Sequence, residues 1–198
     1  MSFCVILFIA YTSHGQLSTK CLPDKGIKIA KTTSKIDSEE NSLEVTHDKK
    51  GRVISIKKNT DDFIHKRIYE NGRLKFLISI DSYATVDTVH VTKYHLSGEA
   101  AEIKNEEGLL QIFNYDDCKE EMNMLISSAG DTIHHYKSIF DKGILIKSIW
   151  TPFQPVKSEH ITEYYDYKFN EKGHWVERKY KNNNGVVIEK RTLTYHEK

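Results

Sequence analysis

Proline, cysteine and any imbalance of charge are scarce in this sequence of 198 residues. It contains 3 prolines and 3 cysteines, and 29 Lys and Arg residues against 28 Asp and Glu residues leave a formal net charge of +1. Because neither sign of charge is in excess, the composition disfavours a surface for nucleic acid or anionic lipid, and we expect no nucleic-acid partner. With 38% hydrophobic residues, the chain is too apolar for a disordered protein and too polar for a membrane protein.

The sequence also lacks the short motifs that mark common catalytic, nucleotide and metal sites. It contains no G-x-S-x-G, G-x-G-x-x-G or G-x-x-x-x-G-K-[ST] pattern, no C-x-x-C, and no H-x-H or H-x-x-x-H among its 10 histidines. His134 and His135 are adjacent, so in a strand they would point to opposite faces and could not chelate one ion. We therefore predict no catalytic residue, no metal site and no cofactor.

Adjacent carboxylates leave one enzymatic alternative open. Such pairs lie beside turns or in loops, at Glu39-Glu40, Asp61-Asp62, Glu106-Glu107, Asp116-Asp117 and Glu120-Glu121. A glycosidase needs two carboxylates about 5 to 9 Å apart across a cleft, a separation that a sequence does not establish. The alternative functions are thus a secreted hydrolase that uses a carboxylate pair, or a purely structural domain of the cell envelope.

The first 15 residues contain no Asp, Glu, Lys or Arg, and Phe3–Tyr11 read FCVILFIAY. This run is too short to cross ~30 Å of hydrocarbon, which needs about 20 helical residues. It suits the apolar region of a secretory signal, with small residues before Gln16. We predict a signal peptide at residues 1–15 and a secreted or periplasmic mature chain without a transmembrane segment. The alternative is a buried N-terminal strand, because no Lys or Arg precedes the run.

Cleavage after Gly15 would leave two cysteines, Cys21 and Cys118. In an oxidising compartment a disulfide could join them and tie the N-terminal arm to the middle of the domain. Pairing requires that their Cα atoms come within ~7 Å, and the sequence leaves both the disulfide and two unpaired thiols open.

Glycine is used sparingly, and eight of the 10 glycines end short polar clusters, as hairpin turns do. Between these clusters apolar and polar residues alternate, as in residues 73–80 and 144–150. Strict alternation over four to eight residues is typical of half-buried strands. Helical spacing is weak from residue 45 onward, and its best candidate is the short segment Asp116–Leu125.

These patterns predict an all-β fold, an antiparallel β-meander of about 10–12 strands in a single twisted or curled sheet. Tight turns join sequential neighbours, and so many strands in one sheet must twist, curl or close. Residues 16–47 carry little pattern, and we predict an N-terminal arm there with at most one strand, around Leu43–Val45. Residues 48–198 form the predicted meander domain.

Two segments resemble the repeat unit of Rhs/YD-repeat proteins. Residues 48–56 (DKKGRVISI) match D-x-x-G-R-[LV]-x-x-[IV], residues 165–178 (YDYKFNEKGHWVER) resemble Y-x-Y-D-x-x-G-N-[WL], and residues 68–74 form a looser copy. The chain departs from the family in its irregular spacing and in having His174 where Asn is usual. It is similar to the short secreted YD-repeat-like proteins common in Bacteroidetes. The resemblance implies YD-like hairpins and an extracytoplasmic location, but no activity.

Aromatic residues are concentrated in one predicted hairpin near the C-terminus. Rings presented on a sheet face would suit a sugar ring or a partner strand, so Tyr164, Trp175 and Tyr180 are the candidate ligand-binding residues. The structural alternative is that such rings form cross-strand pairs, which contribute ~0.2–1 kcal/mol each. We predict a non-enzymatic module that binds a cell-envelope glycan or another protein through one face of its sheet.

Overall fold

The computed structural model describes residues 26–36, 39–60, 64–81, 83, 86–116, 120–153 and 157–197, and every regular element in them is a strand. The predicted all-β class is confirmed. The predicted signal peptide, Cys21 and Cys118 lie outside the described residues. The strands are β1 (Ile27–Ile36), β2 (Glu39–His47), β3 (Val53–Lys58), β4 (Ile64–Glu70), β5 (Arg73–Ile80), β6 (Val86–Tyr94), β7 (Ala100–Asn105), β8 (Leu110–Asp116), β9 (Glu120–Ile126), β10 (Thr132–Asp141), β11 (Ile144–Pro152), β12 (His160–Phe169), β13 (Trp175–Asn182) and β14 (Gly185–Tyr195).

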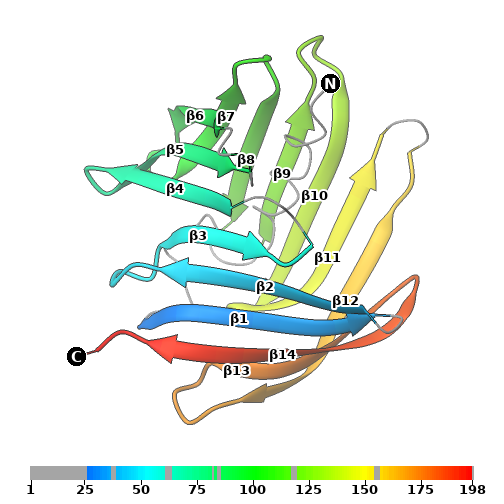
Figure 1. Cartoon of the computed structure of the whole chain (residues 1–198). Coiled ribbons are helices and arrows are strands. Elements are labelled where there is room, and N and C mark those ends of the chain that lie inside the picture. Colours follow the sequence, from blue (N-terminus) through cyan, green and yellow to red (C-terminus); the bar gives the residue numbers. More distant parts are fainter. Residues whose placement is uncertain are drawn as a thin grey trace.

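The sheet closes into a barrel (Figure 1). Each strand pairs antiparallel with the next along the chain, and β1 pairs with β14, for example at Ala30 and Leu193. This corrects the predicted single twisted or curled sheet of about 10–12 strands: the described residues form 14 strands, and the first and last seal the wall. Closure leaves no unpaired edge, which an open meander would have to protect.

The predicted N-terminal arm is wrong in its described part, because residues 26–47 supply two strands of the wall. Apolar alternation is absent from β1: the partners of its register place Thr32 and Ser34 on the inner face, and Lys31 and Thr33 on the outer face. A strand with polar residues on both faces gives no hydrophobic signal. The pairing of β1 with both β2 and β14 therefore comes from the fold as a whole.

The predicted turns are confirmed, since all eight glycine-ending clusters lie between consecutive paired strands. Five of these connections, at residues 48–52, 95–99, 105–109, 127–131 and 170–174, share one hydrogen-bond pattern. The first amide donates to the fifth carbonyl, and the amide of the fourth residue, a glycine, donates to the first carbonyl. The glycine has a positive φ, as in Gly51 (81°) and Gly173 (78°). In the first and last of the five, a side-chain oxygen of Asp48 or Asn170 also accepts two turn amides.

The resemblance to YD repeats thus coincides with this turn, because residues 48–52 and 170–174 are the D-x-x-G and N-x-x-G parts of the two quoted segments. The turn explains why Asp or Asn stands first and glycine fourth. Relationship to the family stays a prediction.

The interior of the barrel is unusually polar. Polar and charged residues are as numerous as hydrophobic ones among the buried side chains. An apolar core occupies one part of the interior, formed by residues of β5 to β8: Leu74, Leu77, Val89, Ala100, Ile103 and Phe113. Tyr69, Val91 and Tyr115 pack against it. The remaining wall carries inward-facing Arg, Glu, Asn, His, Ser and Tyr.

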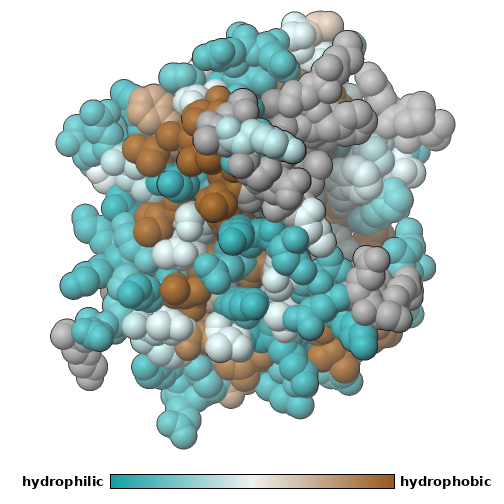
Figure 2. Space-filling model, in the orientation of Figure 1, coloured by the Kyte–Doolittle hydropathy of each residue, from teal (hydrophilic) through white to brown (hydrophobic). Residues whose placement is uncertain are grey.

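Two stretches differ from what the sequence predicted, one in its secondary structure and one in the face that points inward. The described residues of the helical candidate Asp116–Leu125 lie in strands: Asp116 ends β8, and from Glu120 the chain runs as β9, with Asn123 and Leu125 buried. In β5 the buried residues are Leu74, Leu77 and Ser79, whereas Phe76, Ile78 and Ile80 pair with exposed residues of β4 on the outer face. Figure 2 shows apolar residues gathered over β4 to β7, while the part below them, over β1, β2 and β14, is mainly hydrophilic.

Candidate binding site in the barrel interior

The C-terminal strands bring the predicted aromatic residues to the inner side of the wall. Tyr164 of β12 and Tyr180 of β13 are register partners, with ring centroids 5.8 Å apart. Tyr164 is 8% exposed, and Tyr180 and Trp175 are half-buried. The three rings therefore do not form one flat face in solvent. For Tyr164 and Tyr180 the structure shows the cross-strand pair that was the structural alternative.

Arg178 lies at the centre of this group. Its guanidinium carbon lies 4.4 Å from the ring centroids of both Tyr164 and Trp175. Its Nε forms a 2.5 Å ion pair with Oε2 of Glu189, and its Nη1 donates to the hydroxyl of Tyr167 at 3.2 Å. We call Arg178, Glu189, Tyr164, Tyr167 and Trp175 the Arg178 cluster. Rings and guanidinium together offer stacking surface and directed hydrogen-bond donors.

Tyr167 joins this cluster because of an irregularity at Asp166. Strict alternation would place Tyr165 and Tyr167 together, away from Tyr164. Asp166 has a positive φ of 52°, and the register with β13 shifts between Tyr165 and Lys168. The shift turns Tyr167 toward Arg178 while Tyr165 pairs with Lys179. No glycine lies at this bulge, so no residue pattern predicts it.

The electrostatics of the Arg178 cluster keep its charges fixed. Burial opposes the charged guanidinium, but Glu189 and the neighbouring tyrosines outweigh it and hold the pKa of Arg178 above its usual value. Burial likewise raises the pKa values of Tyr164, Tyr167 and Tyr180, so their hydroxyls stay protonated. The cluster therefore presents neutral hydroxyls and a permanent ion pair.

More cationic groups flank Trp175. The guanidinium carbon of Arg191 lies 4.8 Å from the centroid of its ring, so two arginines contact the same indole. Nearby in sequence, Lys172 lies 3.5 Å from the ring centroid of Tyr195, whose hydroxyl accepts from Asn170 at 2.7 Å. This end of β13 and β14 combines aromatic rings with side chains that donate hydrogen bonds.

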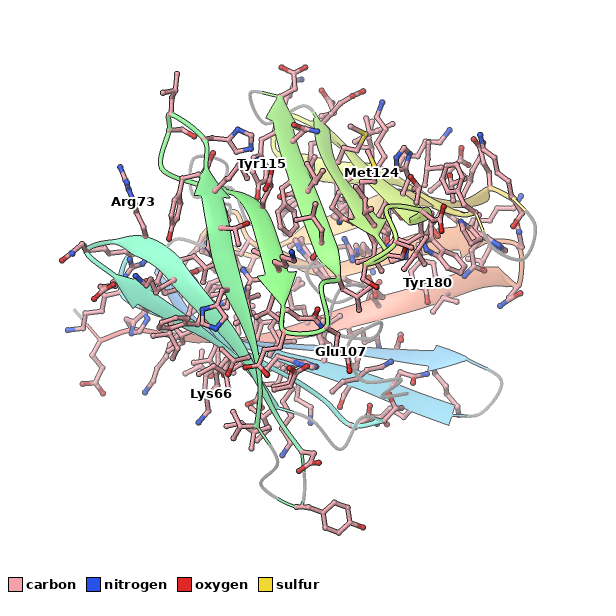
Figure 3. All side chains as sticks on the ribbon, turned by 90° about the horizontal axis from the view of Figure 1, so that it is seen from above. Lys66, Arg73, Glu107, Tyr115, Met124 and Tyr180 are labelled. Atoms are coloured by element: carbon pink, nitrogen blue, oxygen red, sulfur yellow. The ribbon has the colours of Figure 1, made fainter. Side chains whose placement is uncertain are left out.

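A second polar cluster lies on another part of the wall, around Tyr115 of β8; Figure 3 shows Tyr115 and Tyr180 well separated. Burial raises the pKa of Tyr115, and Glu121 and Glu99 raise it further, whereas Arg67 opposes the rise. Tyr115 and Glu121 are register partners. Tyr69 acts on the same hydroxyl, so β4, β8 and β9 meet here.

Two atoms near this second cluster lack hydrogen-bond partners within the described part of the chain. They are Nη2 of Arg67 and Oδ1 of Asn123, and each residue is only 5% exposed. A buried polar group without a partner costs about 1–3 kcal/mol, and more if it is charged. Sequence reasoning missed Arg67 because IHKRIYE reads as a solvated segment, and only the register shows that its alternate residues His65 and Arg67 face inward.

In the two adjacent carboxylate pairs whose side chains are both described, the carboxylates do not converge on one site. Glu120 faces outward, where it pairs with Lys137 at 2.8 Å, while Glu121 is buried inside. Glu106 and Glu107 are exposed in a turn, and Asp61, Asp62 and Asp117 lie outside the described residues. In the described ranges no three His, Cys, Asp or Glu side chains are grouped so as to hold a metal ion.

His134 faces the interior and is 5% exposed. Burial, helped by His135, lowers its pKa to about 4. The ring is therefore neutral at neutral pH, and it lies edge-on to Trp150 with ring centroids 6.5 Å apart. Among the described residues, no helix is long and apolar enough to cross a membrane.

Comparison with known proteins shows the fold alone. No family model matches the chain, and no curated protein matches it. One similar solved structure is a porin-like protein from Bacteroides uniformis, with 9% sequence identity and a TM-score of 0.53. The alignment covers 87% of this chain and 99% of the other. The two chains share a barrel architecture, and at this identity the likeness carries no residue roles.

Proposed function

We propose that this chain is a non-enzymatic, extracytoplasmic barrel. Its outer wall faces water, and its interior binds a glycan at the Arg178 cluster. The observation that supports it is the placement of Trp175, Tyr164 and Tyr167 around a buried arginine on the inner wall. Aromatic faces stack on sugar rings, and guanidinium and hydroxyl groups bond sugar hydroxyls. The proposed site thus lies on the inner face of the sheet rather than on a face exposed to solvent.

The charged residues of the outer wall favour a barrel that is surrounded by water rather than by lipid. Outward-facing lysines occur within strands on most of the circumference: Lys31, Lys57, Lys66, Lys104, Lys137, Lys147, Lys179 and Lys190. On the lipid face of a membrane barrel, each Lys near the midplane costs about 2–4 kcal/mol. Ion pairs such as Lys168–Glu177 at 2.7 Å add further charge to the outer wall. This distribution favours a secreted or periplasmic barrel over a membrane pore.

The Arg178 cluster also supports a binding role more than a catalytic one. Its carboxylate, Glu189, is engaged by Arg178, and its tyrosines are held neutral. A hydrolase of the two-carboxylate type would need a second acid across a cleft. The groups that remain are suited to orienting a polar ligand.

A glycan microarray probed with the exported, mature protein tests this proposal. We expect saturable binding to at least one glycan, and Trp175→Ala should weaken it at least tenfold. Ile188→Ala, which removes an exposed residue paired with Lys179 on the outer wall, is the matched control and should leave binding unchanged. Equal binding by wild type and Trp175→Ala, or none by either, would reject the site.

The hydrolase alternative has one observation in its favour. Glu99 and Glu121 are both buried, and both act on the hydroxyl of Tyr115. If they form an acid and base pair, glycans retained by the barrel should be cleaved, with new reducing ends that Glu121→Gln abolishes. Intact glycans after prolonged incubation with the wild type would support the binding role.

A further inference from the structure

The group around Tyr115 contains a buried guanidinium, that of Arg67, whose Nη2 has no acceptor among the described residues. Arg67 lies on β4 across the ladder from Leu77, a residue of the apolar core. Tyr69, two residues along β4, packs against the same core as Tyr115 does. The charge of Arg67 acts on the hydroxyl of Tyr115. The inner face of β4 therefore approaches that of β8.

An acceptor without a partner lies close by on β9. Glu121 stands opposite Tyr115, and Asn123 is the next inward residue of the same strand, opposite Phe113. Within the described residues, Oδ1 of Asn123 has no donor and Nη2 of Arg67 has no acceptor. We call Arg67, Asn123, Tyr115 and Glu121 the Arg67 cluster. One missing donor and one missing acceptor in the same region are the complement of a hydroxyl group, which can accept and donate at once.

The charges around Tyr115 restrict the ligand further. The carboxylates of Glu121, which lies opposite Tyr115, and of Glu99 are both buried and both raise the pKa of Tyr115. Their negative potential opposes the binding of an anionic ligand there. Arg67 in turn opposes a cation beside it. A neutral polyol can form hydrogen bonds with both Nη2 of Arg67 and Oδ1 of Asn123 without adding charge. Tyr69 and Tyr115 adjoin the site, and their hydroxyls donate to the carbonyls of Val53 and Ala100.

We propose that the Arg67 cluster is a second binding site in the barrel interior, specific for the hydroxyl groups of a neutral saccharide. The site deepens the proposed glycan-binding function by naming a ligand charge and a second set of residues. It shares no residue with the Arg178 cluster, so the two sites can be tested apart.

Ligand-observed saturation-transfer NMR on the exported, mature protein tests the proposal. The probes are the methyl glycosides of glucose, galactose, mannose and N-acetylglucosamine, with glucuronate and glucosamine as charged counterparts. At least one neutral glycoside should bind saturably to the wild type and to Trp175→Ala, and both charged sugars should bind at least tenfold more weakly. Loss of this binding in Trp175→Ala alone would place the ligand at the Arg178 cluster and overturn the second site.

Two variants on different strands remove the unpaired polar groups while keeping a similar side-chain shape. Arg67→Met and Asn123→Leu should each weaken the neutral glycoside at least tenfold, with circular dichroism spectra like that of the wild type. Arg73→Met removes an exposed guanidinium of β5 and should have no effect. Unchanged binding in both interior variants, tighter binding of glucuronate than of any neutral sugar, or no binding at all would overturn the proposal.

Discussion

Glu189→Gln should destabilise the barrel far more than its small change in shape suggests. The substitution removes the carboxylate that pairs with Arg178, which is 7% exposed and stays charged. Only the rings of Tyr164 and Trp175 and the hydroxyl of Tyr167 then remain around the guanidinium. Breaking a buried ion pair by removing one partner typically costs about 3–5 kcal/mol. Arg178→Met should cost a similar amount, because Glu189 is then left with its charge in the interior.

The double variant Arg178→Met/Glu189→Gln separates the ion pair from the packing around it. With both charges gone, the remaining losses are the hydrogen bond to Tyr167 and the two contacts of the guanidinium with Tyr164 and Trp175, the latter about 0.5–2 kcal/mol each. The double variant should therefore lose several kcal/mol less than the sum of the two single variants.

Urea unfolding followed by far-UV circular dichroism measures these losses, since Trp175 adjoins the site and would perturb a fluorescence signal. The exposed pair of Lys179 and Asp166 is the control, and Lys179→Met should cost far less stability than Glu189→Gln. If the double variant loses the sum of the single losses within about 0.5 kcal/mol, Arg178 and Glu189 act independently and the reasoning fails.

Three further outcomes follow from single residues. Arg67→Met should cost less stability in urea than Arg178→Met, because Nη2 of Arg67 has no acceptor among the described residues, so its removal leaves no such partner unpaired; an equal loss would show that the guanidinium is as fully paired as that of Arg178. His134 has a folded pKa of about 4, below the ordinary 6.5, so the unfolded chain takes up a proton first. Stability should fall as the pH drops from about 6.5 to 4, and His134→Gln should flatten that part of the profile; an unchanged slope contradicts the burial of a neutral ring. Gly173→Ala forces a side chain into a φ of 78° and should cost about 1–2 kcal/mol by thermal unfolding, with Gly173→Asn costing less; equal losses would argue against the turn geometry.

Local features of this fold were predictable because they depend on neighbouring residues. Asp48 and Asn170 cap turns that end in glycine, and the sequence shows both residues at fixed spacing. Closure was not predictable in this way. It depends on β1 pairing with β14, more than 150 residues apart, through the largely polar residues of β1.

Which face of a strand points inward was also hidden, because the interior is not the more apolar side. In β5 the outer face carries Phe76 and Ile78 while Ser79 lies inside, so hydrophobic alternation indicates the wrong direction. The aromatic site was found only in part. Tyr164 and Trp175 are visible as a concentration of rings, but no pattern in the sequence singles out Arg178, whose contact with Tyr167 depends on the bulge at Asp166.

Ligand binding inside the barrel can be read from one ring at a time, because the chain has only two tryptophans. In Trp150→Phe, Trp175 alone reports, and in Trp175→Phe, Trp150 alone reports. Titration with the glycan selected on the microarray should change the emission of Trp175 saturably and leave that of Trp150 unchanged. A saturable change at Trp150 with none at Trp175 would contradict binding at the Arg178 cluster.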